Sequence, residues 1–101
     1  MDKSKIFGLL TICRKAGRLV TGFDMSAETL GKGKAELVIL ASDISPKTEK
    51  EIRFFAAKKN VNVLKSDIPM NEIGLTPGRN TAVITICDSG FAARFTELLS
   101  R

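Results

Sequence analysis

The chain has 101 residues, which fits one compact domain, and its 44% hydrophobic and 27% charged residues are close to ordinary globular usage. It contains no histidine, which excludes Ser-His-Asp and Cys-His catalysis and histidine-ligated zinc. Sixteen Lys and Arg against eleven Asp and Glu give a net charge of +5. Residues 1–34 hold seven basic and three acidic side chains, a net of +4. This clustering favours a polyanionic partner over an ordinary basic surface.

The longest apolar run, Leu37 to Ala41, has the length of a strand and is far too short to cross a bilayer. The N-terminus lacks the apolar core and cleavage site of a signal peptide. Cys13 and Cys87 are too few for a four-cysteine zinc site, and we expect them to be reduced, buried thiols. The sequence thus predicts one cytoplasmic, monomeric domain over residues 1–101, with no metal, cofactor or membrane contact.

Helices and strands alternate along the whole chain, as shown by apolar periodicity and turn residues. In chain order we expect a helix over 4–16, a strand over 19–21, a helix over 24–33, a strand over 37–41, a helix over 46–59, a strand over 61–64, a short helix over 70–73, a loop over 74–80, a strand over 82–87 and a closing helix from 89. This alternation predicts an α/β domain with helices layered on a mostly parallel or mixed sheet.

Local signals mark several element ends. Gly17 and Gly33 should end the first two helices, because glycine accepts the left-handed conformation that follows a helix. Ser45 precedes Pro46 as a helix N-cap, whereas Thr21 and Asp24 form only a weak capping box. The apolar side chains expected to face inward on the last three long helices are Ala27, Leu30, Ile52, Phe55, Ala56, Phe91, Phe95, Leu98 and Leu99.

No motif in the chain indicates catalysis. Gly31 to Lys34, with the sequence GKGK, lies at a helix end and lacks the spacing of a phosphate-binding P-loop. Asp43, Glu49 and Glu51 fit helix caps and solvated faces better than acid–base pairs. We therefore expect a protein that is not an enzyme and has no catalytic or metal-ligating residues.

The segment from Arg14 to Lys34 carries the strongest signal for a binding site. Arg14 and Lys15 end one helix, Arg18 follows, and the next helix starts after Gly22, so a single short strand should bring these residues close together. Backbone N–H groups at a helix start attract phosphate, and the surrounding cations add affinity for nucleic acid. The alternative is a set of ordinary helix-end charges and one cap.

The residues Arg14 to Gly22 (RKAGRLVTG) and Lys34 to Asp43 (KAELVILASD) resemble the L-seven-Ae superfamily, the ribosomal-protein family of kink-turn RNA binders. The likeness is greatest to its small bacterial YlxQ-like members, and it runs over nearly the whole chain. The resemblance implies a three-layer α/β/α sandwich around a four-stranded mixed sheet. It also implies binding of structured RNA, kink-turn-like or ribosomal, with the ribosome as partner.

The RNA site implied by the resemblance comprises the start of the second helix, the loop before the last strand and their basic surroundings. Its expected residues are Arg14, Lys15, Arg18, Gly22, Phe23, Asp24, Met25, Glu28, Lys32, Arg79 and Asn80. Kink-turn binders of the family have Asn-Glu after Gly-x and Lys three residues beyond the Glu, where this chain has Asp24, Met25 and Glu28. An ionised Asp can only accept hydrogen bonds, and Met lacks a carboxylate. We therefore expect altered or relaxed kink-turn specificity; the alternative is a regulatory or protein-interaction domain that has kept the fold and lost RNA binding.

Overall fold

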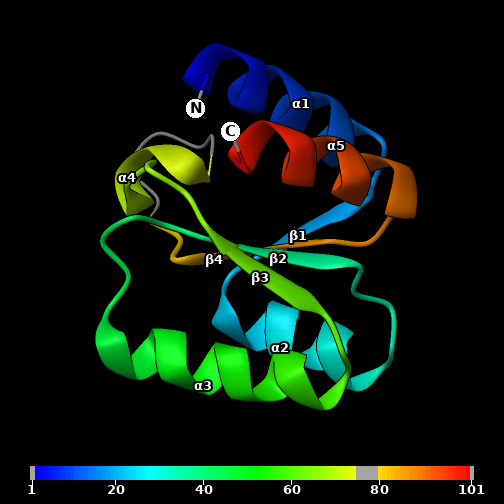
Figure 1. Cartoon of the computed structure of the whole chain (residues 1–101), viewed down its shortest axis with the longest axis vertical. Helices are drawn as coiled ribbons and strands as arrows, with labels where there is room; N and C mark the ends of the chain where they lie inside the picture. The colour runs from blue at the N-terminus through cyan, green and yellow to red at the C-terminus, as the bar shows by residue number, and fades with distance from the viewer. Residues whose placement is uncertain (1, 75–79, 101) are drawn as a thin grey trace.

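Strands and helices alternate along the part of the chain that the computed structural model describes, residues 2–74 and 80–100 (Figure 1). The elements are α1 Lys3–Lys15, β1 Leu19–Thr21, α2 Phe23–Gly31, β2 Leu37–Leu40, α3 Pro46–Lys58, β3 Asn62–Lys65, α4 Met70–Ile73, β4 Val83–Ile86 and α5 Ser89–Leu99. The predicted alternation is confirmed. Within the described residues, no helix has the length and apolar character needed to cross a membrane.

The four strands form one mixed sheet in the order β1-β4-β2-β3. β4 lies between β1 and β2 and is antiparallel to both, while β2 is parallel to β3. Ile86 on β4 is opposite Leu19 on one side and Leu37 on the other. The last strand in the chain is thus a central strand of the sheet, and the expected four-stranded mixed sheet is confirmed.

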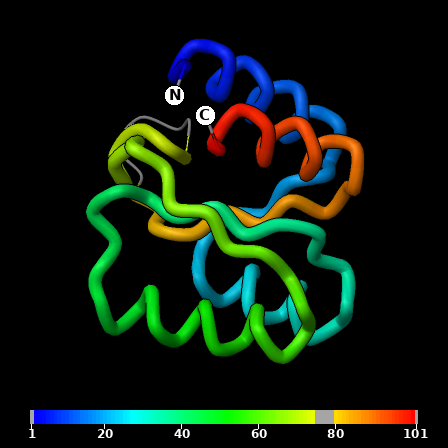
Figure 2. Tube along the Cα trace, in the orientation of Figure 1, coloured from blue at the N-terminus to red at the C-terminus, as the bar shows by residue number. Residues whose placement is uncertain are grey.

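Helices cover both faces of this sheet. α1 and α5 pack beside each other on one face, together with α4, and α2 and α3 pack beside each other on the opposite face (Figures 1 and 2). Side chains alternate along β2, so that Leu37 and Ile39 join the core under α1 and α5, whereas Val38 and Leu40 join the core under α2 and α3. Every residue from Leu37 to Ala41 is at most 1% exposed, as its continuous apolar run predicts.

The structure confirms the predicted helix ends at Gly17 and Gly33 and the predicted N-cap at Ser45, but the predicted capping box at the start of α2 is wrong. Gly17 and Gly33 follow α1 and α2 with φ of 71° and 72°, and Ser45 Oγ accepts a hydrogen bond from the Thr48 N–H at 3.2 Å. The expected Thr21–Asp24 capping box is not formed. Gly22 is instead the N-cap of α2, with φ 95° and ψ 159°, a backbone conformation that side chains exclude almost entirely.

The predicted burial of the helices is largely confirmed, with Phe55 as the main correction. Ile52, Ala56 and Phe95 are fully buried, but Phe55 is 36% exposed. Its ring lies at the edge of the α2–α3 interface, where it contacts two other rings instead of the core. Helical periodicity places this residue on the inner half of α3 but does not reveal how far α2 reaches over it. The other partial corrections are Ala27, Phe91, Leu99 and Cys87, which are half-buried.

Two buried hydroxyl groups of the described residues have contrasting surroundings. Ser66 Oγ donates to the Leu40 carbonyl oxygen at 2.8 Å and accepts from the Ile68 N–H at 3.2 Å. Thr85 Oγ1, on the central strand β4, makes no hydrogen bond to any described residue. A buried hydroxyl without a partner opposes folding, because it has lost its hydration.

Replacing Thr85 by Val should therefore stabilise the protein. The change Thr85→Val keeps the shape and removes the unpaired hydroxyl, so we expect the free energy of unfolding to rise by about 1 kcal/mol. Ser66→Ala is the matched control, since it leaves the Ile68 N–H unpaired and should lower that free energy by about 1–3 kcal/mol. Urea unfolding followed by circular dichroism measures both, and a destabilised Thr85→Val variant would contradict the assignment.

Gly22 should resist substitution for backbone reasons alone. A Cβ built at Gly22 meets nothing within 4 Å, so Gly22→Ala tests the conformation and not a steric contact. We expect a loss of about 1–3 kcal/mol in the free energy of unfolding. Gly8→Ala is the control, because Gly8 lies inside α1 with open space around it and should gain about 0.5–1 kcal/mol. Thermal unfolding of the two variants beside the parent would show opposite shifts.

Candidate nucleic-acid interface

The start of α2 lies beside the start of β4. The Gly22 N–H donates to the Val83 carbonyl oxygen at 2.8 Å. Asn80 is exposed and precedes Val83 by three residues, so it can lie no farther than about 10 Å from Val83 along an extended chain. Asn80, the expected loop residue that the structure describes, therefore lies within about 10 Å of the strand start that pairs with Gly22. Arg79, the other expected residue of that loop, lies outside the described residues.

The start of α2 differs from the starts of the other long helices in the described part of the chain. Asp2, Ser45 and Asp88 each accept a hydrogen bond from a first-turn N–H group of α1, α3 and α5, respectively. At Gly22 there is no side chain to do so, and α2 has no side-chain cap. The first-turn N–H groups of α2 thus lack a side-chain acceptor at the N-cap, and with the positive end of the helix dipole they suit a phosphate or a carbonyl acceptor.

The expected specificity residues line one exposed side of α2. Asp24, Glu28 and Lys32 follow at intervals of four residues, and Met25 beside them is 50% exposed. Lys32 Nζ lies 2.8 Å from Glu28 Oε1, and this hydrogen bond holds the pKa of the Glu28 carboxyl below its usual value. Glu28 stands where kink-turn binders of the family have Lys. The Lys32 ammonium therefore lies one helical turn beyond that position and is held there by its ion pair with Glu28.

Phe23 has a different place from its neighbours. It is half-buried, joins the core between α2 and α3, and its ring centroid lies 6.2 Å from that of Phe55. It therefore anchors the start of α2 against α3.

The basic residues before α2 lie at the other end of β1. The Arg18 carbonyl oxygen accepts hydrogen bonds from the Cys87 N–H at 2.8 Å and from Cys13 Sγ at 3.4 Å, which fixes Arg18 beside the end of β4. Arg14 and Lys15 end α1 just before it. Gly22, in contrast, lies beside the start of β4, four residues or about 13 Å farther along the extended strand. The expected single group is therefore two groups at the two ends of β1.

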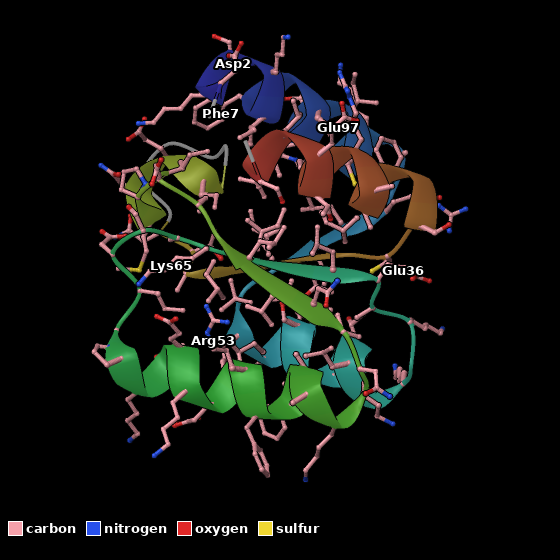
Figure 3. The ribbon with its side chains drawn as sticks, viewed as in Figure 1. Asp2, Phe7, Glu36, Arg53, Lys65 and Glu97 are labelled. Atoms are coloured by element: carbon pink, nitrogen blue, oxygen red, sulfur yellow. The ribbon has the colours of Figure 1, made fainter. Side chains whose placement is uncertain are left out.

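Lys32 and Lys34 join the basic group at the end of β4. α2 carries the chain back along the sheet, because β2 starts with Leu37 opposite Ile86. Burial raises the pKa of the Cys87 thiol, while the nearby Arg18 and Lys34 act to lower it and Glu36 to raise it. Glu36 lies at this end of the sheet in Figure 3. Lys34 belongs to this basic group but not to the expected site residues, although the charge count of residues 1–34 includes it.

The arrangement offers binding surfaces but little for acid–base or nucleophilic chemistry. Burial raises the pKa of the Cys13 thiol to about 11, so it is protonated at neutral pH. Among residues 2–74 and 80–100, no three acidic or cysteine side chains gather as metal ligands.

A shallow hollow of about 380 Å³ lies between α1 and α5, and it is lined by Leu9, Asp88, Gly90, Phe91 and Arg94.

Known proteins share both the sequence pattern and this fold. The model of the ribosomal protein L7Ae/L30e/S12e/Gadd45 family matches residues 4–95. The RNA-binding protein YlxQ of Enterococcus faecium is 28% identical over 98 residues, 97% of this chain and 94% of its own. The large ribosomal subunit protein eL30 of Yarrowia lipolytica is 30% identical over 93 residues, 90% of this chain and 85% of its own.

Solved structures agree with these sequence matches. A protein of unknown function from Bacillus halodurans has a TM-score of 0.83 and 26% identity, with 92% of this chain and 94% of that chain covered. The 15.5kD RNA binding protein of Giardia lamblia has a TM-score of 0.77 and 21% identity, with 97% and 87% covered, and this likeness shows the fold alone. The chain belongs to the ribosomal protein L7Ae/L30e/S12e/Gadd45 family.

Proposed function

We propose that this protein is a non-catalytic RNA-binding protein associated with the ribosome. The observation that carries the proposal is the start of α2, which has no side-chain cap and lies beside Val83 at the start of β4, with a basic group at the other end of β1. The related YlxQ protein is named as RNA-binding and the related eL30 protein as part of the large ribosomal subunit. These relatives favour RNA over the alternative of a protein-interaction domain.

The residues at the two ends of β1 contribute different interactions with RNA. At one end, the first-turn N–H groups of α2 and Asn80 are placed to hydrogen-bond phosphate or base-edge acceptors. At the other end, the exposed cations supply electrostatic affinity that carries no sequence information. These cations are Arg14, Lys15, Arg18, Lys32 and Lys34.

We propose that specificity for kink-turns is altered or relaxed. Asp24 and Met25 cannot present the amide and the carboxylate that family members use on base edges. Lys32, held by Glu28, can still meet a phosphate near the position where those proteins have Lys. The protein would then bind folded RNA by its shape and charge, as a monomer in the cytoplasm with ribosomal RNA as its target.

Removing the early basic residues should weaken RNA binding and its dependence on salt. The triple change Arg14→Ala, Lys15→Ala and Arg18→Ala should lower the slope of log affinity against log salt by roughly 0.7–0.9 for each phosphate that the protein no longer neutralises. Filter binding of a kink-turn RNA and an unrelated hairpin at several salt concentrations measures this.

The matched control removes two cations at the start of α1, about 14 Å or more along the helix from Arg14, and one on α5, by Lys3→Ala, Lys5→Ala and Arg94→Ala. Both triple variants lose the same net charge, so only the position of the charge differs. The control should keep most of the slope. Equal decreases in the two variants would indicate attraction by net charge alone, and no decrease in either would favour a protein partner.

Restoring the family pattern on α2 should separate specific from general affinity. Asp24→Asn with Met25→Glu restores base-edge partners, each worth about 1–3 kcal/mol, so it should strengthen binding of a kink-turn RNA alone. Glu28→Lys changes a phosphate-facing charge by two units and should strengthen binding of both a kink-turn RNA and an unrelated hairpin. Competition between the two RNAs measures the difference. If the combined triple variant binds both RNAs no better than the parent, the α2 start is not the RNA site.

A further inference from the structure

Three phenylalanine rings form a continuous line from the start of α2 to the outer face of α3. Phe54 is 58% exposed, and its ring centroid lies 5.9 Å from that of Phe55. The Phe55 ring in turn lies 6.2 Å from Phe23, the first residue of α2. α2 and α3 lie side by side on their face of the sheet (Figure 1). The start of the proposed RNA site is therefore continuous with an exposed aromatic surface, formed by the rings of Phe54 and Phe55.

Lysine side chains surround this aromatic surface. Lys58 Nζ lies 4.4 Å from the centroid of the Phe54 ring, a cation–π contact at an exposed site. Lys47 and Lys50 precede Phe54 by seven and four residues, which places them on the same side of the helix, with Glu51 as the one acidic residue of that stripe. The outer face of α3 thus carries one exposed aromatic ring with three lysines and one acidic residue along the same stripe.

The other charged residues of α3 are directed elsewhere. Glu49 Oε2 lies 2.9 Å from Arg53 Nε, and Glu49 Oε1 lies 3.1 Å from Lys65 Nζ on β3. Figure 3 shows Arg53 rising from α3 toward the sheet, below Lys65. This network ties α3 to the edge of the sheet, so that it does not compensate the lysines of the outer face.

We propose that the outer face of α3 binds an unpaired nucleotide next to the folded RNA element, with its base stacked on Phe54 and its phosphates near Lys50 and Lys58. The proposal rests on the proposed function and extends its site. Bases of every kind stack on aromatic rings, and lysines beside the ring track the backbone of a single strand. The base would take the place of the Lys58 ammonium over the ring, and that ammonium would then meet the adjoining phosphate. The surplus of lysines on this face favours an anionic ligand over an apolar protein partner.

The test compares a blunt kink-turn RNA with the same RNA carrying a single-stranded tail of five adenosines at either end. A tail that reaches α3 should lower the dissociation constant about five-fold or more, the effect of stacking one base. Phe54→Ala and Phe54→Leu should both abolish this gain, because leucine keeps apolar volume without a ring. Phe54→Trp should keep it. The exposed position of Phe54 lets all three variants fold.

Fluorescence gives a second, independent readout. The chain contains no Trp and no Tyr, so Phe54→Trp introduces a unique fluorophore that a stacked adenine should quench. Ile12→Trp is the matched control: Ile12 is also 58% exposed but lies on α1, across the sheet, and its variant should not be quenched. Lys50→Gln and Lys58→Gln should each lower the slope of log affinity against log salt by roughly 0.7 for the tailed RNA. Neither change should affect that slope for the blunt RNA.

The outcomes separate this inference from the proposed function. Binding of the blunt RNA with no gain from either tail overturns the inference and leaves the proposed function standing. Binding of neither RNA at low salt overturns both. A dimer in sedimentation velocity that Phe54→Ala dissociates would show that a second copy of the chain covers this face, which also overturns the inference.

Discussion

The pairing of β4 with β1 on one side and β2 on the other is the constraint on which the rest of the structure depends. β2 and β4 are buried on both faces, so the sheet is stable only when helices cover each side. The same pairing places Gly22 opposite Val83 and Arg18 opposite Cys87. Hence the packing of the core also decides where the backbone N–H groups of α2 and the basic side chains emerge.

Much of the fold could be predicted from the sequence, because its signals are local. The apolar runs at 37–41 and 82–87 indicate buried strands, and Gly17, Gly33 and Ser45 mark helix ends. Strand order could not be predicted from these patterns, since nothing local requires the last strand to enter between β1 and β2. The exposure of Phe55 was missed for a related reason: burial on a helix depends on where the neighbouring helix ends.

The residues of the candidate site could be proposed from the sequence, but their arrangement in space could not. The resemblance points to Gly22 and to the segment before β4, and the register places Gly22 beside Val83, where β4 starts. The sequence suggests that Arg14 and Lys15 lie close to Gly22, because only one strand of three residues, β1, separates the two helices along the chain. In the sheet, that strand is long enough to separate the start of α2 from the cations, which the proposed function treats as two contacts with one RNA.

The late position of β4 in the chain also bears on how the protein is made. As synthesis proceeds from the N-terminus, β1 has no strand beside it, and β2 can pair with β3 alone, until Val83 to Ile86 have been added. Closing the sheet then requires contacts across more than sixty residues, the kind of long-range pairing that slows folding. In a nascent chain, Arg18 and Gly22 would lack their partners Cys87 and Val83, so the start of α2 and the cations at the end of α1 would take up their positions relative to β2 only after β4 is in place.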